Sequence, residues 1–360
     1  MEILIHFLKQ KAENLFSGYF ALVMATGALS IGTHLLEMHT ISWILVFINV
    51  LAYIILWILT LTRLIYFFPK VIKDLTSHLN GPGFFTLVAG TCVFGSQLII
   101  VVHIHTISKF LWILAIILWF IIMYTFFTAV TIRKNKPTMS EGINGAWLIA
   151  SVATQSVSIL GTLLAPYIGG EKQQVVLFFT LAMYFLGCML YLNIITLIFY
   201  RFTFVEFKFE ALTPPYWINM GAVAITTLAG STLILHADLS PLLNQIIPFL
   251  KGFTLFFWIT GTWWIPLLFI LAIWRHGIHH YPLSYDPQFW GMAFPLAMYT
   301  TSTFQFSKAL GLSFLLIIPK FMVVVAIAVW LFVFTGMIHH LMRGLKNGHF
   351  SNKRISNWNK

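Results

Sequence analysis

The sequence predicts an all-α integral membrane protein with ten transmembrane helices arranged as five helical hairpins, and three observations support this fold class. The 360 residues are 59% hydrophobic, only 9% are charged, and the mean hydropathy is +0.88. A soluble domain would carry about 25% charged residues. The charges are also segregated along the chain, and the charge-free windows between them repeat one pattern.

Ten windows contain no Asp, Glu, Lys or Arg, and the 21 basic and 10 acidic residues all fall outside them. Each window reaches the roughly 18–20 residues that a helix needs to cross the hydrocarbon core. A transmembrane β-barrel would instead show alternating segments of about ten residues. The windows are 17–36, 43–62, 84–102, 110–132, 142–170, 173–200, 211–237, 252–274, 287–307 and 321–342. We therefore expect an amino-terminal segment (1–16), a ten-helix transport domain (17–342) and a basic tail (343–360).

The basic residues lie unevenly between the two sets of connections. Sixteen of them lie in the amino terminus, in the connections after the even-numbered windows and in the tail. The opposite connections hold only Lys109, Lys172, Lys251 and Lys308, and Lys320 lies at the start of the last window. By the positive-inside rule, both termini face the cytoplasm of a multi-pass protein in the cell membrane. The net charge of +11 therefore reports topology, and we expect no nucleic-acid partner.

The odd-numbered windows begin with similar residues: GYFALVMATGALS, GFFTLVAGTCVFG, GAWLIASVATQS, PYWINMGAVAITT and QFWGMAFPLAMYTT. Aligning them on their second bulky position gives an aromatic column of Phe20, Phe85, Trp147, Trp217 and Trp290. The separations are 65, 62, 70 and 73 residues, so each repeat is one two-helix hairpin. Internal repeats are common in transport proteins, where the pathway lies at the repeat interface. The column therefore supplies candidate pore-lining residues.

The odd-numbered windows are also rich in small residues, which let helices approach closely in a membrane. The first contains Gly18, Ala25, Gly27 and Gly32, whereas the second offers little that is small. We therefore expect the odd-numbered helices to form an inner ring around a central pore, with the even-numbered helices outside. Dense packing without a pore is the alternative that this pattern leaves open.

The odd-numbered windows carry most of the intramembrane polar side chains, including Ser151, Gln155, Asn219 and Thr301. A single hydroxyl most often bonds back to a carbonyl one turn earlier, but buried amides are costly and more informative. No Asp or Glu lies in any window, so acidic proton or sodium relays have no candidate residues. A neutral pathway of this kind suits small inorganic or organic anions.

Other kinds of chemistry find little support. Cys92 and Cys188 lie inside windows without a Cys/His cluster, and His276, His279 and His280 lack a partnering carboxylate motif. No phosphate-binding glycine loop or nucleophile elbow occurs. We therefore expect no enzyme activity, no cofactor and no metal site.

In the ninth window, Phe294 shares a repeat column with Met24, Ala89, Ser151 and Gly221, which are small or flexible. Pro295 cannot donate to the carbonyl of Gly291, so we expect a kink there. A rigid ring beside a kink and opposite small residues would close a pore. The alternative is an ordinary packed phenylalanine in a chain that has 35 of them.

The motifs GYFALVMATGALSIG and FWGMAFPLAMYTT, together with the repeated hairpins, resemble the tellurite-resistance/dicarboxylate-transporter family. That family includes tellurite-resistance protein A, slow-type anion channels, and malate and sulfite exporters. The resemblance covers residues 15–343 and implies a quasi-fivefold ring, a homotrimer with one pore per subunit, and a gating phenylalanine that matches Phe294.

The resemblance leaves two transport functions open. The first is a passive anion channel, favoured by a neutral pore and an absent acidic relay. The second is a carrier for C4-dicarboxylates, sulfite or tellurite, and a dicarboxylate carrier would hold a fixed cation in its pathway. Arg63 and Lys320 are the nearest candidates for that cation. A membrane scaffold without transport activity is the remaining alternative.

Overall fold

The structure is a computed structural model that describes residues 9–356, with side chains described up to residue 343. Within this range it contains helices and connections but no strand, which confirms the all-helical prediction. Eight helices are long and apolar enough to cross a membrane. The helix Ala21–Leu35 is apolar but shorter, and Trp290–Leu310 is long enough but falls outside these eight. By length and composition, the described part of the chain therefore has eight candidate transmembrane helices, two fewer than the sequence predicts.

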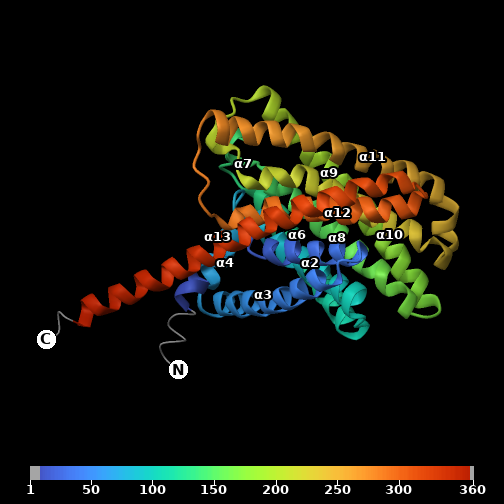
Figure 1. Cartoon of the computed structure of the whole chain (residues 1–360), viewed down its shortest axis with the longest axis horizontal. Helices are drawn as coiled ribbons and strands as arrows, with labels where there is room; N and C mark the ends of the chain where they lie inside the picture. The colour runs from blue at the N-terminus through green and yellow to red at the C-terminus, as the bar shows by residue number, and fades with distance from the viewer. Residues whose placement is uncertain (1–8, 357–360) are drawn as a thin grey trace.

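Ten helices pair as five consecutive hairpins. The hairpins are α2 (Ala21–Leu35) with α3 (His39–Tyr66), α5 (Phe85–Gln97) with α6 (His105–Ile132), α8 (Ile149–Leu164) with α9 (Glu171–Phe204), α10 (Ile218–Leu235) with α11 (Pro241–Ile273), and α12 (Trp290–Leu310) with α13 (Ile317–Ser356). Short helices α4 (Phe68–Leu75) and α7 (Met139–Gly142) lie in the connections at the end where both chain termini are found (Figure 1).

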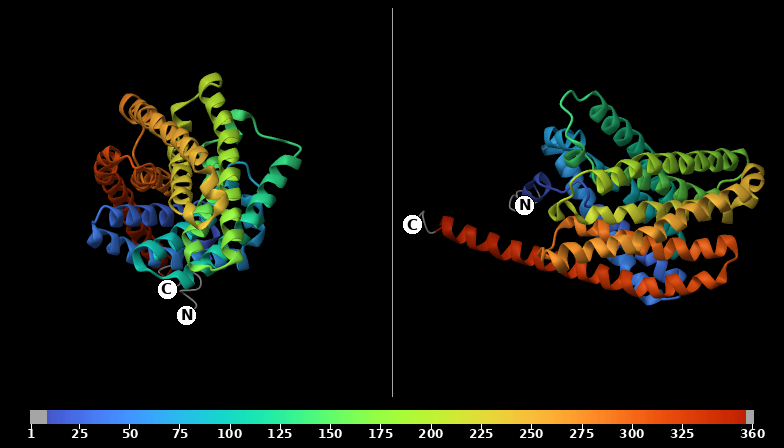
Figure 2. Two further views of the ribbon diagram at one scale, coloured as in Figure 1. Left: turned by 90° about the vertical axis from the view of Figure 1, so that its right-hand side faces the viewer. Right: turned by 90° about the horizontal axis from the view of Figure 1, so that it is seen from above.

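The first helix of each hairpin packs against the first helix of the next. Helix α2 contacts α5, α5 contacts α8, α8 contacts α10, α10 contacts α12, and α12 contacts α2. These five helices therefore form a closed ring. Figure 2 (left) looks along the bundle, and the chain colours pass around it in order until α13 returns beside the first hairpin. We call these five helices the inner helices.

Burial separates the inner helices from their hairpin partners. Apolar windows of the segments containing α5, α8 and α10 are 89%, 94% and 94% buried, against 22–44% for α3, α6, α9, α11 and α13. The outer helices expose rows of Ile, Leu and Phe side chains, as helices facing lipid do. Small residues explain the difference. A Cβ at Gly221 of α10, for example, would lie 2.7 Å from the Pro295 ring of α12.

The last helix extends beyond the bundle. Helix α13 continues to Ser356 and projects past the other helices at the end where the termini lie (Figure 1). Most of the predicted basic tail, 343–356, is therefore a continuation of the last helix, and residues 357–360 lie outside the described part of the chain.

Candidate functional site: two cavities on the ring axis

The inner helices enclose two cavities. The first, which we call the wide cavity, has a volume of about 300 Å³, and the second, the narrow cavity, has about 30 Å³. The wide cavity is lined by Ala21 and Met24 of α2, Thr86 of α5, Ile149 and Val152 of α8, Ile218 of α10, and Gly291 and Phe294 of α12. The narrow cavity is lined by Ala28, Ile31, Val93, Ser96, Ser156, Ile159, Ile225, Leu228, Met298 and Thr301, among others. On every inner helix the wide-cavity residues come first, so the two cavities follow one another along the ring axis.

Phe294 lies between the two cavities. Its side chain is 1% exposed and is the last residue of α12 to line the wide cavity, and Met298, one turn later, lines the narrow one. On α2, likewise, Met24 lines the wide cavity, and Ala28, one turn later, lines the narrow one. A cavity of about 30 Å³ holds one or two water molecules but no hydrated ion. The two cavities are therefore separate in this structure, and Phe294 and Met24 lie at the step between them.

Pro295 and Gly221 bring α10 and α12 together beside Phe294. Helix α12 runs without interruption from Trp290 to Leu310 with Pro295 inside it, so the proline does not break the helix. Because proline has no N–H, the carbonyl of Gly291 lacks its usual partner four residues later. Gly291 lines the wide cavity, and Gly221 contacts the proline ring instead of lining either cavity.

In α8 the structure differs from the repeat alignment by one residue. The hydroxyl of Ser151 donates to the carbonyl of Gly187 in α9 at 2.8 Å, and Val152 lines the wide cavity in the place expected for Ser151. Gln155 also faces α9, where its amide nitrogen donates to the carbonyl of Tyr184 at 3.0 Å. Both polar side chains therefore join the two helices of the third hairpin.

The aromatic column faces the outer helices, so it lines neither axial cavity. Four of its members pack against the outer helix of their own hairpin: Phe20 on Tyr53 and Trp57, Phe85 on Phe126 and Phe127, Trp217 on Phe269, and Trp290 on Trp330. Trp147 instead donates its indole N–H to the carbonyls of His78 and Gly142, at 3.0 Å each. The repeated aromatic rings therefore pack the helices of the hairpins together. Their repetition reflects this packing role and not a pore-lining one.

Three further predicted residues take different positions. Ala89 is fully buried in α5 between Thr86, which lines the wide cavity, and Val93, which lines the narrow one, but Ala89 itself lines neither cavity. Thr301 lines the narrow cavity and donates to the carbonyl of Ala28 at 3.0 Å, which links α12 to α2. Asn219 is buried but lines neither cavity, and its amide atoms have no partner among the described residues.

The sequence did not single out the ring of polar residues at the mouth of the wide cavity. Each inner helix, or the turn before it, contributes one member: Ser17, Asn80, Asn144, Thr213 and Gln288. The sequence pattern that could have identified them is their position, since each of these polar residues lies a few residues before an odd-numbered window or near its start. Two of these turns are capped: Asn144 Oδ1 accepts from the Ala146 N–H, and Asp286 Oδ1 from the Gln288 N–H.

The electrostatics of the wide cavity favour negative ions. All five inner helices begin at this cavity, and a helix amino terminus carries a partial positive charge of about half an elementary charge. In the described part of the chain, no Asp, Glu, Lys or Arg lines either axial cavity. Oriented helix ends without a fixed counter-charge attract an anion and still allow it to leave.

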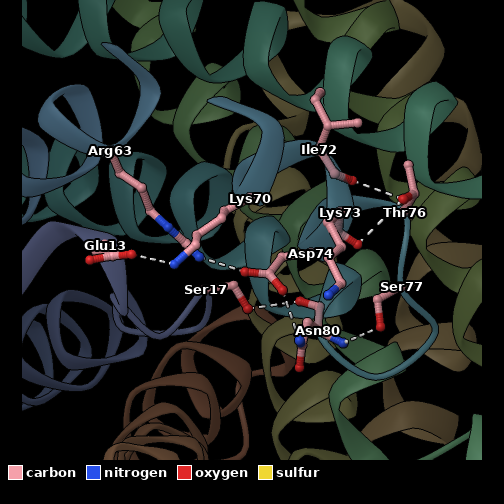
Figure 3. A network of polar contacts seen from close by, with 10 residues as sticks. All are labelled: Glu13, Ser17, Arg63, Lys70, Ile72, Lys73, Asp74, Thr76, Ser77 and Asn80. Carbon is pink, nitrogen blue, oxygen red and sulfur yellow. Dashed lines mark hydrogen bonds and ion pairs between the residues drawn. The ribbon is translucent and has the colours of Figure 1, made fainter. Parts of the chain in front are cut away.

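A polar network ties the mouth of the wide cavity to the first outer helix (Figure 3). Arg63 of α3 pairs with Asp74, whose second oxygen accepts from the Asn80 amide at 3.0 Å. The carbonyl of Asn80 in turn accepts from the Ser17 hydroxyl at 2.7 Å. Lys70 pairs with Glu13 beside this chain of contacts. The network fixes Ser17 and Asn80, which both line the mouth.

The histidines near the end of α11 do not gather into a metal site. His276 contacts the carbonyl of Tyr281 at 2.8 Å, and His279 stacks on Phe209 with ring centroids 4.5 Å apart. Among the described residues, no group of three or more His, Cys, Asp or Glu side chains is placed to hold a metal ion.

Comparison with known proteins agrees with this architecture. Residues 14–338 match the SLAC1 family model, described as voltage-dependent anion channel. A Methanocaldococcus jannaschii protein named as an uncharacterized transporter is 25% identical over 304 residues, which covers 83% of this chain and 86% of that protein. The sulfite efflux pump SSU1 of Trichophyton rubrum is 23% identical over 355 residues, 91% of each chain. An uncharacterized membrane protein of Mycobacterium tuberculosis is 38% identical over 152 residues, 42% of this chain and 77% of that protein.

The family match covers most of the chain, including all five inner helices and the cavities between them. It is a family of membrane channels and transporters, not of enzymes. The chain is therefore a multi-pass membrane protein that belongs to the SLAC1 family of voltage-dependent anion channels.

Proposed function

We propose that the chain is a passive channel for small anions, with a pathway along the axis of the inner helices that Phe294 closes. One observation carries this proposal. Two cavities follow one another along the axis, Phe294 and Met24 lie at the step between them, and five helix amino termini converge on the wider cavity. The neutral lining then lets an anion pass without trapping it.

The proposed channel has ten transmembrane helices. Helix α12 packs between α10 and α2, and α2 packs between α12 and α5. The segments that contain α5 and α10, Gly81–Val102 and Pro214–Leu235, are long enough to span a membrane and belong to the same closed ring. We therefore place α2 and α12 at the same depth. The basic connections lie where the inner helices begin, which supports a topology with that end and both termini in the cytoplasm of a cell-membrane protein. The exposed apolar outer helices suit contact with lipid or with neighbouring subunits of the homotrimer that the family resemblance implies.

A sulfite carrier is the second candidate, because a relative named as a sulfite efflux pump aligns along 91% of both chains. A C4-dicarboxylate or tellurite carrier has less support. Arg63 pairs with Asp74 on the first outer helix and Lys320 is exposed on α13, so neither lines an axial cavity. A divalent carboxylate needs a fixed cation to offset its loss of water. The neutral axis therefore favours small anions.

Flux measurements in liposomes test this function. With an imposed membrane potential, chloride, nitrate and sulfite flux should reverse sign with the potential, and a pH step alone should cause no accumulation. Accumulation against a gradient, driven by the pH step, would establish a coupled carrier in place of the channel. Liposomes without protein provide the background.

A charge placed at the mouth of the wide cavity tests the selectivity. Gln288→Glu is nearly isosteric and adds a negative charge, and Gln288→Lys adds a positive one. We expect the Glu variant to lower anion flux at low salt about fivefold, as an interaction on the order of 1 kcal/mol would. The Lys variant should match or exceed the unmodified protein. Equal flux through both variants would show that anions do not pass this mouth.

A further inference from the structure

The fifth hairpin differs from the others in how its arginine is used. The first four outer helices have an arginine at or next to their carboxyl ends, and Arg343 follows at a similar spacing on α13, which continues to Ser356. These five arginines are separated by 70, 68, 74 and 68 residues. In the second, third and fourth hairpins, this arginine donates to a backbone carbonyl in the connection that precedes the inner helix of the same hairpin. The pairs are Arg133 with Thr76, Arg201 with Ile143, and Arg275 with Leu212.

Arg343 holds the corresponding place on α13. It is exposed and makes no hydrogen bond or ion pair with the residues that the structure describes. It lines a cavity of about 710 Å³ between α13 and the connection before α12, which we call the polar cavity. In the second, third and fourth hairpins, the guanidinium and the preceding connection meet directly, and Arg63 of the first hairpin pairs with Asp74 instead. In the fifth hairpin, the guanidinium and the connection stand apart, with room for a ligand between them.

The polar cavity presents cationic and hydrogen-bonding groups on one face of α13. His339, His340 and Arg343 lie within about one helical turn, and Ser284 and Tyr285 face them from the connection. Gly336 allows the Tyr285 ring to approach α13, because a Cβ there would lie 3.2 Å from it. Burial and then the neighbouring Tyr19 phenol raise the pKa of Tyr285, so its hydroxyl stays neutral. No acidic side chain of the described chain lines this cavity.

A second cavity adjoins the first in the apolar part of the bundle. It has a volume of about 230 Å³ and lies between α11 and α13. It is lined mostly by apolar residues, including Ala272, Val325 and Val329, and Arg275 and His276 also line it. We call it the apolar cavity. Leu283, Phe289 and Phe332 line both cavities, so the two adjoin each other. The chain's own last helix does not fill them, since α13 continues away from the bundle (Figure 1).

We propose that these two cavities together bind an anionic phospholipid, with its phosphate headgroup in the polar cavity and part of an acyl chain in the apolar cavity. Arginine binds phosphate oxygens with two parallel hydrogen bonds, and basic pockets beside transmembrane helices take up acidic headgroups. A free phosphate would use the polar cavity alone. The adjoining apolar cavity has room for part of an acyl chain, which favours a lipid over a free phosphate.

The site adjoins the start of two inner helices. The Tyr285 hydroxyl lies 3.2 Å from that of Tyr19, directly before α2, and Asp286 caps the turn before α12. Those helices carry Met24 and Phe294. A lipid bound here therefore steadies the segments that position the closure of the axis.

Lipid retention by the full chain tests this inference without a transport measurement, so it stands or falls separately from the channel proposal. The protein is placed in phosphatidylcholine nanodiscs with or without phosphatidylglycerol, and native mass spectrometry counts the retained lipids. Phosphatidylglycerol should be retained and should raise the melting temperature. Arg343→Gln should weaken its binding about tenfold, which corresponds to about 1.4 kcal/mol. Lys134→Gln removes one exposed charge from another connection and should leave retention unchanged.

Two further arms distinguish the occupant. Ala272→Phe and, on the facing helix, Val329→Phe fill the apolar cavity without changing charge, and both should reduce retention of phosphatidylglycerol. Glycerol 3-phosphate, which has the headgroup chemistry without acyl chains, should stabilise the protein little. Protection by glycerol 3-phosphate equal to that by the lipid, with no effect of the filling variants, would identify a soluble phosphate ester instead. Equal losses in Arg343→Gln and Lys134→Gln, or equal retention of both lipids, would also overturn the proposal.

Discussion

At residue 294 a bulky ring stands where the other repeats carry Met24, Ala89, Val152 and Gly221. The contrast was visible in the sequence, because Phe294 and its proline stood out against small or flexible residues. The neighbour from α8 was predicted wrongly as Ser151, since an alignment on bulky residues takes Trp147 in place of Leu148. Trp147 turns away because its indole N–H finds the carbonyls of His78 and Gly142. Only the folded connection reveals those two acceptors.

Replacing Phe294 by alanine tests whether the ring closes the axis. The ring faces the wide cavity and the passage to the narrow one, so its removal should open the passage and raise anion flux while the protein still folds. Phe294→Leu should give an intermediate flux. The measurements are anion flux in liposomes and a thermal melt of each purified variant.

Ordinary core packing at this position gives a different outcome. Replacing a fully packed core phenylalanine by alanine lowers the free energy of unfolding by about 3–5 kcal/mol. A strongly destabilised Phe294→Ala variant without added flux, beside a Leu variant equal to the unmodified protein, would exclude Phe294 as the closure.

Among whole elements, the hairpins and the ring were predictable, and the orientation of each inner helix was not. Charge-free windows and small residues distinguish the two sets of helices. An inner helix, however, is buried on every side. Its polar side chains do not mark the side that meets the axis, because some of them, such as Ser151 and Gln155, bond to the outer helix. For that reason the aromatic column was assigned to the pore, although it packs on the outer helices.

The connections before α8 and α10 meet at a glycine. A Cβ at Gly145 would lie 2.2 Å from the carbonyl oxygen of Pro215 and 2.6 Å from the Cα of Tyr216, and these backbone atoms cannot rotate away. We expect Gly145→Ala to destabilise the protein by about 1–3 kcal/mol, as overpacking does. Gly252→Ala is the control, because no atom lies within 4 Å of its Cβ position. Thermal melts compare them, and equal melting temperatures would show that this junction is loose.

The arginines near the ends of the outer helices should differ in their contribution to stability. Arg201 is 6% exposed, donates to the Ile143 carbonyl and lies 5.4 Å from the Phe207 ring centroid. We expect Arg201→Gln to lower the free energy of unfolding by about 2–3 kcal/mol, the value of a hydrogen bond to a charged group. Arg133→Gln changes an exposed residue whose bond to Thr76 is 3.4 Å long, and should cost under about 1 kcal/mol. Chemical denaturation of both variants measures their free energies of unfolding. A larger loss of stability for Arg133→Gln than for Arg201→Gln would contradict the prediction.

For the molecule as a whole, one end of the ring gathers the helix amino termini, the basic connections and both chain ends. Charge placement made this asymmetry predictable, because it requires only the positions of Lys and Arg along the chain. The cavities on the axis and beside α13 were not predictable, since each is lined by residues from distant hairpins. A cavity depends on which side chains meet, and that in turn depends on the closed ring.

Orientation in the membrane follows from the same asymmetry and can be measured with single cysteines. Lys136 lies in the connection at the end where the termini are found, Lys172 lies at the opposite end, and both are exposed. The protein's own Cys92 and Cys188 are buried, at 0% and 2% exposed, so the unmodified chain should give no background labelling. With an impermeant maleimide on intact cells, Lys172→Cys should be labelled and Lys136→Cys should react only after the membrane is opened. Labelling of Lys136→Cys alone in intact cells would reverse the topology. The helix amino termini would then face outward, and the wide cavity would receive its anions from outside the cell.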